Sequence, residues 1–179
     1  TAGILAVGGN VIKLGVIPTP AVAYLARYYN ADAGIVISAS HNTFEYNGIK
    51  FFNGDGYKLD DLLEEKIEDI IISSIDVNSH ITGDKIGKCL EAAENATELY
   101  ADHLMSTVDF RLDGKKIVLD CANGASFRVA EMVYRRLGAE VTVIGNVSRL
   151  PLLHCRPPRE SRLSARFQAY HLKFSCLCL

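Results

Sequence analysis

The sequence predicts an α/β fold, and two observations lead to that prediction. The pattern strand, helix, strand occurs twice along the chain, over residues 11–38 and 117–144. This pattern is the unit that builds parallel sheets with a right-handed crossover. The composition fits a packed domain, because 49% of the 179 residues are hydrophobic and 22% are charged. That proportion supplies enough apolar surface to offset the entropy lost on folding.

The first unit begins with a short apolar strand at residues 11–16. Pro18-Thr19-Pro20 ends this strand, and Thr19 before Pro20 is typical of a helix start. Thr19 is therefore predicted to cap a helix over residues 20–30, whose apolar residues recur at helical spacing. A compact β-branched strand follows at residues 34–38. The unit thus predicts two strands of a parallel sheet joined by a helix.

Several elements are predicted between the two units. Residues 48–52 form a strand, and residues 53–56 (Asn-Gly-Asp-Gly) form a turn because these pairs accept positive φ. Asp61 with Glu64 resembles a capping box and begins a helix. The apolar face of that helix comprises Leu62, Leu63, Ile67, Ile70 and Ile71. Residues 76–89 are predicted to be irregular, and a long helix is predicted over residues 91–108.

The second unit comprises a strand at residues 117–120, a helix at 125–137 and a strand at 140–144. We place a domain boundary in the long helix, so that residues 1–92 form one domain and residues 93–147 begin another. Residues 1–147 carry 13 basic and 20 acidic side chains, whereas residues 148–179 carry six and one. This basic tail is typical of a frame-shifted reading, and we expect poor order there.

Composition also bears on partners and location. The net charge of −2 argues against nucleic acid or an anionic membrane as the main partner. The apolar runs are too short for a transmembrane helix, and no secretory signal is recognisable at the start. The five cysteines form no CxxC pair, which favours reduced thiols in the cytoplasm.

The polar loop Ser38-Ala39-Ser40-His41-Asn42 is the main candidate site, since ligands of α/β sheets bind beyond the carboxyl ends of strands. A network of capping and turn hydrogen bonds is the alternative interpretation. A Ser–His hydrolase is disfavoured, because adjacent Ser40 and His41 suit that proton relay poorly and no G-x-S-x-G motif is present.

Lys50 and the segment that begins at Asp120 are weaker candidates. Strand alternation places Lys50 on the face opposite Ile49 and Phe51, where it can meet an anion at the loop or simply remain solvated. The segment Asp120-Cys121-Ala122-Asn123-Gly124-Ala125 is either an anion site at a helix N-terminus or a tight turn, and we favour the turn.

Four motifs in order make the chain resemble the α-D-phosphohexomutases. They are Gly15 to Pro20 (GVIPTP), residues 38–42 (SASHN), residues 46–52 (YNGIKFF) and residues 118–125 (VLDCANGA). The resemblance covers residues 1–147 and implies partial α/β domains with mixed sheets, incomplete relative to the four domains of the family. Within the family, the motifs are most similar to members acting on glucosamine phosphates.

The resemblance also implies a chemistry. Ser40 matches the phosphoserine, which gives its phosphoryl group to a hexose phosphate and recovers another from the resulting sugar 1,6-bisphosphate. Mg²⁺ would bind Ser40 through its phosphate, His41 and Lys50 would act beside it, and Asn42 would shape the loop. The implied reaction interconverts glucosamine 6-phosphate and glucosamine 1-phosphate, a precursor of UDP-N-acetylglucosamine.

Some family features have no counterpart in this sequence. Thr43 replaces the proline that follows Ser-His-Asn in the family, and a looser loop is expected without the ring that fixes φ. The Asp-Gly-Asp-x-Asp-Arg loop that holds the magnesium is absent, so we expect this chain to be inactive alone. A sister enzyme for glucose or mannose phosphates and a non-catalytic fragment that binds phosphate are the alternatives.

Overall fold

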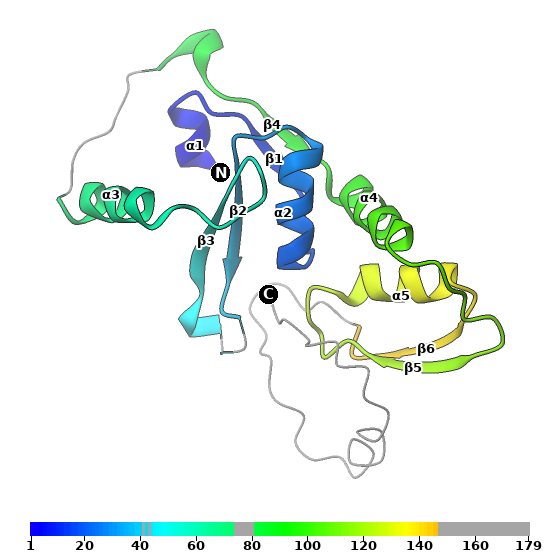
Figure 1. Ribbon diagram of the computed structural model, residues 1–179. Coiled ribbons are helices and arrows are strands. Elements are labelled where there is room, and N and C mark those ends of the chain that lie inside the picture. The colour runs from blue at the N-terminus through cyan, green and yellow to red at the C-terminus, as the bar shows by residue number, and fades with distance from the viewer. Residues whose placement is uncertain (41, 43, 74–80, 147–179) are drawn as a thin grey trace.

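A computed structural model describes residues 1–40, 42, 44–73 and 81–146 of the chain (Figure 1). The expectations for His41, for Thr43 and for residues 148–179 lie outside these described residues. The elements in chain order are α1 (Ala2–Ala6), β1 (Val11–Lys13), α2 (Thr19–Tyr28), β2 (Ala33–Ser38), the 3-10 turn η1 (Phe44–Tyr46), β3 (Gly48–Asn53), α3 (Asp61–Ile72), the 3-10 turn η2 (Gly83–Lys85), β4 (Cys89–Glu91), α4 (Ala93–Ser106), β5 (Lys116–Asp120), α5 (Phe127–Arg136) and β6 (Glu140–Ile144).

The strands pair in both directions, so the fold is mixed α/β as predicted. β5 and β6 pair in parallel across α5, which confirms the second unit. The parallel pairing expected of the first unit is wrong, because β1 pairs in parallel with β4 and β2 pairs antiparallel with β3. A short loop joins β2 to β3 and favours a hairpin, whereas β4 has only three residues and too few side chains to signal a strand.

All four predicted helix starts differ by one or two residues, and α5 begins at Phe127 instead of residue 125. α2 begins at Thr19 with Pro18 as its N-cap, so Thr19 is not the capping residue. α3 is capped by Asp60, whose carboxylate accepts the N–H of Leu62 at 2.8 Å, one residue earlier than the predicted Asp61. α4 begins at Ala93, because the preceding residues pair with β1 instead.

The core lies around α2, which packs against the β2–β3 hairpin on one side and against α4 on the other (Figure 1). Leu25 of α2 is fully buried. The ring of Tyr24 stacks on His103 of α4 with centroids 4.0 Å apart. α5 packs against α4 and contributes Val129 to the same cluster. That cluster comprises Ile17, Ala21, Val22, Leu25, Val36, Ala96, Tyr100 and Val129.

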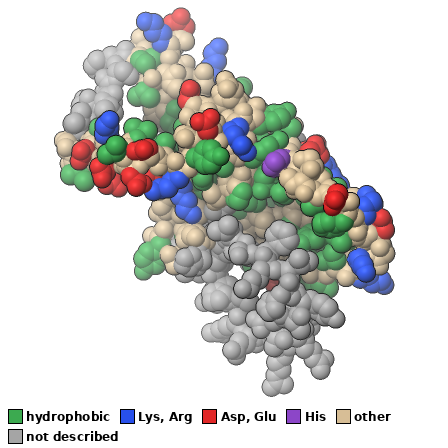
Figure 2. Space-filling model, viewed as in Figure 1, with side chains coloured by type: hydrophobic (Ala, Val, Ile, Leu, Met, Phe, Trp, Pro, Cys, Tyr) green, Lys and Arg blue, Asp and Glu red, His purple; other side chains and the backbone are tan. Residues whose placement is uncertain are grey.

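The opposite face of the hairpin and the predicted apolar face of α3 remain exposed. Ile37 and Ile49 are 70% and 61% exposed, and no residue of α3 is buried. Figure 2 shows acidic side chains gathered with hydrophobic ones on the α3 side of the molecule.

Within the described ranges, none of the helices has the length and apolar character needed to cross a membrane.

Candidate functional site

The candidate loop joins the two strands of the β2–β3 hairpin. Ser38 and Gly48 form the last pair of the ladder, so residues 39–47 extend beyond the end of the sheet. The inner face of β2 is anchored to α2, because Gly34, Val36 and Ser38 alternate as buried residues along the strand. The loop therefore leaves a firmly packed strand end, at the position that the sequence predicted.

Ser40 has a left-handed backbone conformation, with φ of 59°. Its N–H donates to the hydroxyl of Ser38 at 2.9 Å, and the N–H of Asn42 donates to the carbonyl of Ala39 at 3.0 Å. A residue with a side chain loses roughly 1–2 kcal/mol in this conformation. One hydrogen bond contributes about 0.5–1.5 kcal/mol net, so the bond that Ser40 donates to Ser38 offsets a large part of this cost.

Lys50 lies on the inner face of the hairpin. It is directly opposite Val36, and residues directly opposite in an antiparallel pair share a face. The pairs Ile35–Phe51 and Ile37–Ile49 lie on the outer face. The prediction that Lys50 lies on the face opposite Ile49 and Phe51 is therefore confirmed. The Lys50 side chain is half-buried and forms no ion pair with any described residue.

The inner face beyond Lys50 carries only small residues. The next pair toward the loop is Ser38 with Gly48. A Cβ placed on Gly48 would meet only the carbonyl oxygen of Ser38, at 4.0 Å. The absence of a side chain at Gly48 leaves Lys50 without a bulky neighbour at the next inner-face position toward the loop.

His41 and Asn42 are the other residues predicted for the site. His41 lies outside the described residues, so its predicted role is not tested. Asn42 is exposed, and its backbone N–H donates to the carbonyl of Ala39; its loop-shaping role stays a prediction. Sequence reasoning included Ser38 in the candidate loop but predicted no role for its side chain. Its presence in the loop motif was the only signal, because its burial depends on strand register.

No metal site is formed by the part of the chain that the structure describes. It contains no group of three His, Cys, Asp or Glu side chains that could hold an ion. The donors present around Ser40 are hydroxyl, amide and lysine groups, which do not form the carboxylate set that Mg²⁺ prefers. These residues therefore do not by themselves fit a magnesium site.

The segment that begins at Asp120 is a tight turn at the end of β5, as favoured from the sequence. Ala122 and Asn123 have φ of 48° and 56°. The carboxylate of Asp120 accepts the N–H of Ala122 at 2.9 Å, and the N–H of Gly124 donates to the carbonyl of Cys121 at 2.7 Å. The Asp120 carboxylate thus has a backbone partner within the turn, which fits the turn interpretation.

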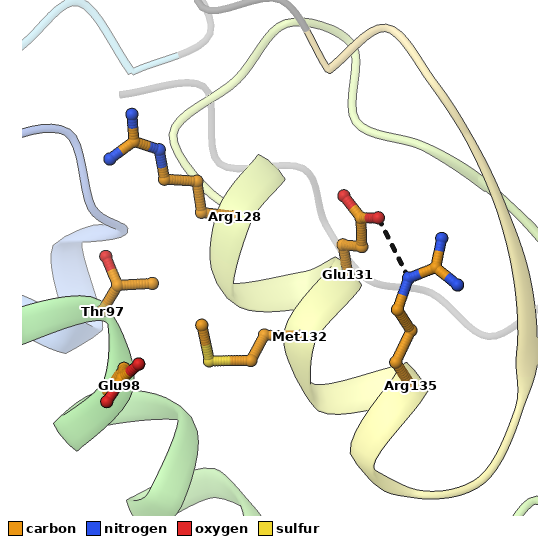
Figure 3. Close-up of a pocket in the computed structure, with 6 residues that line it drawn as sticks. All are labelled: Thr97, Glu98, Arg128, Glu131, Met132 and Arg135. Carbon is orange, nitrogen blue, oxygen red and sulfur yellow. Dashed lines mark hydrogen bonds and ion pairs between the residues drawn. The ribbon is translucent and has the colours of Figure 1, made fainter. Parts of the chain in front are cut away.

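A cavity of about 540 Å³ opens between α4 and α5 (Figure 3). Its lining carries both charge signs, and Glu131 accepts a hydrogen bond from Arg135 at 3.0 Å. The lining residues are Thr97, Glu98, Arg128, Glu131, Met132 and Arg135. The sequence did not predict this cavity, whose lining includes no residue of the Ser40 loop.

Comparisons with known proteins agree with these observations. Residues 1–77 match the model of phosphoglucomutase/phosphomannomutase, alpha/beta/alpha domain I. The chain is 54% identical over 145 residues to phosphoglucosamine mutase of Acetivibrio thermocellus, covering 81% of this chain and 32% of that relative. Phosphoglucosamine mutase of Clostridium novyi gives the same identity and coverage. The chain thus spans about a third of the length of the curated relatives it matches.

A solved structure shares the fold. It is a phosphoglucomutase/phosphomannomutase family protein of Burkholderia thailandensis, with a TM-score of 0.61 and 22% sequence identity. The likeness covers 85% of this chain and 33% of that chain. The sequence motifs, the mixed α/β fold and the matched relatives agree, and they make this chain similar to the first third of phosphoglucomutase/phosphomannomutase family proteins.

Proposed function

We propose that Ser40 accepts and returns a phosphoryl group in the interconversion of hexose 6-phosphate and hexose 1-phosphate, with glucosamine as the sugar. The observation that carries this proposal is the held conformation of Ser40, at the end of a packed hairpin whose inner face also bears Lys50. The 54% identity to two phosphoglucosamine mutases supports glucosamine as the sugar.

The proposed step is a phosphoryl transfer between two oxygens. A bond forms between the hydroxyl oxygen of Ser40 and phosphorus as the bond from phosphorus to a sugar oxygen breaks. The serine proton is lost and the sugar oxygen gains one, so the step balances. The reverse transfer to the other end of the sugar completes the interconversion. Such a reaction depends mainly on positioning and on neutralising charge. The ammonium of Lys50 is suited to neutralise charge on the transferring group.

Three further expectations belong to this proposal. The family resemblance implies Mg²⁺ on the phosphate of Ser40, with ligands beyond those described here, and no step above depends on it. Residues 1–92 and 93–147 would be parts of two domains that meet at α4. The small-molecule partner would be a phosphosugar, and a cytoplasmic location stays a prediction.

Phosphoryl transfer to the full chain tests the proposal. The chain is incubated with Mg²⁺ and ³²P-labelled glucosamine 1,6-bisphosphate, and covalent label is counted after denaturation. We expect label on the unmodified chain, none on Ser40→Ala, and slower labelling by the glucose and mannose bisphosphates. One transfer is measured instead of turnover, because the chain spans about a third of the length of its relatives.

Label that washes away on denaturation would contradict the proposal and indicate a fragment that only binds phosphate. Faster labelling by the glucose or mannose compound would reassign the sugar.

A further inference from the structure

Ser38 is a buried hydroxyl beneath the loop that carries Ser40. Ser38 is 3% exposed. Among the residues that the structure describes, Ser38 and Thr97 are the buried polar ones. A buried hydroxyl is costly unless it forms a hydrogen bond. The Ser38 oxygen accepts the backbone N–H of Ser40 at 2.9 Å, so its interaction is directed at the loop.

The hydroxyl is not needed to hold the strand itself. The backbone of Ser38 already pairs with Gly48 in the ladder of β2 and β3. The side chain instead holds Ser40, which has a positive φ of 59°. Since φ sets the direction of the Cα–Cβ bond, this hydrogen bond also sets where the Ser40 hydroxyl stands relative to the inner face and Lys50.

We propose that Ser38 is a positioning residue for phosphoryl transfer at Ser40, an inference that rests on the proposed function of that serine. Its hydroxyl holds Ser40 in the conformation that presents the accepting oxygen to the donor. Without this bond, Ser40 relaxes toward the extended region that residues with a side chain prefer, and its oxygen moves away from the reacting position.

Three substitutions separate the hydroxyl from the volume of the side chain. Ser38→Ala removes the acceptor, and Ser38→Cys keeps a group of similar shape but offers only a weak acceptor. Ser38→Thr keeps the hydroxyl and adds a methyl group. The opposite residue, Gly48, has no side chain and leaves space on that face, so the threonine is expected to fit.

The experiment measures covalent phosphorylation of the full chain by glucosamine 1,6-bisphosphate over a range of concentrations. We expect the maximal rate to fall about tenfold in Ser38→Ala and Ser38→Cys, the factor that corresponds to one ordinary hydrogen bond. The half-saturating concentration should stay unchanged, and Ser38→Thr should retain the rate within about twofold. Amide hydrogen exchange at Ser40 should accelerate in the alanine and cysteine variants alone.

Two results would overturn this role. An unchanged maximal rate in Ser38→Ala, despite faster exchange at Ser40, would show that the bond does not serve transfer. An equal loss in all three variants would show that packing, and not the hydroxyl, matters. Failure of the unmodified chain to become phosphorylated would contradict the proposed function and this role together, whereas the first two results leave the proposed function standing.

Discussion

Lys50 lies directly opposite Val36 in the ladder of β2 and β3, and therefore on the face of the hairpin that packs against α2. Val36 is buried in the core, whereas Lys50, in the same pair of the ladder, is half-buried; the pairs Ile37–Ile49 and Ser38–Gly48 separate it from the loop. The relationship places a cation on the inner face of the hairpin, two pairs before the loop, and a long flexible side chain can span that separation.

Replacing Lys50 should slow phosphorylation of Ser40 without unfolding the chain. Lys50→Met keeps the length of the stem and removes the charge, so the rate with a sugar bisphosphate should fall about 10²-fold. Lys50→Arg keeps the charge and should retain more of the rate. Urea unfolding should shift by less than about 0.5 kcal/mol in the methionine variant. Equal rates for all three chains would show that the lysine is only a solvated strand residue.

Leu25 should be among the most costly positions to truncate. It is fully buried at the centre of the cluster between the hairpin, α2 and α4. Leu25→Ala should lower the free energy of unfolding by about 2–5 kcal/mol, measured by urea denaturation followed by circular dichroism. Ile71→Ala on α3 is the matched control, because Ile71 is 70% exposed. The control should change stability by no more than about 0.5 kcal/mol. Similar losses for both would contradict the described core.

The cap of α3 distinguishes two neighbouring aspartates. Asp60 accepts the N–H of Leu62, so Asp60→Ala should cost about 1 kcal/mol of helix stability. Asp61→Ala should cost less, because Asp61 forms only an exposed ion pair with Lys58. Amide exchange across residues 61–72 reports the difference. Faster exchange in Asp61→Ala than in Asp60→Ala would show that Asp61 caps the helix, as the sequence predicted.

Alkaline conditions should destabilise the fold partly through Tyr100. Burial raises the pKa of its phenol above the ordinary value of 10.0. The folded chain therefore binds this proton more tightly than the unfolded chain. The resulting stability is fully present below pH 10.0 and is lost as the pH rises through the raised pKa.

Urea unfolding at a series of pH values, with tyrosinate absorbance as a second signal, measures this effect. Tyr100→Phe should flatten the alkaline decline, although the raised pKa of the half-buried Tyr134 leaves part of it. An unchanged decline in Tyr100→Phe would show that other groups cause it.

Local patterns predicted the elements but not their partners. The strand before Ser40, the strand that carries Lys50 and the whole second unit follow from β-branched runs, turn pairs and helical spacing. The pairing of Val11 with Cys89 does not, because it joins segments 78 residues apart, and the three-residue β4 has no pattern of its own.

The residues of the candidate site divide in the same way. The loop motif and its resemblance predict Ser40 and Lys50, whereas the role proposed for Ser38 depends on its burial and on the register with Gly48. Neither burial nor register is encoded in the spacing of the motif. Thr19 failed as a cap for a related reason, because Pro18 already has the extended backbone conformation of an N-cap residue.

The position of the phosphate is the most direct test of the central claim. The full chain, after reaction with glucosamine 1,6-bisphosphate, is digested and the phosphopeptides are fragmented in a mass spectrometer. The account predicts one phosphate on Ser40 and none on Ser38, two residues away, with the product glucosamine monophosphate released in equal amount. Phosphate on another residue, or an unmodified Ser40 in a chain shown to be folded, would contradict it.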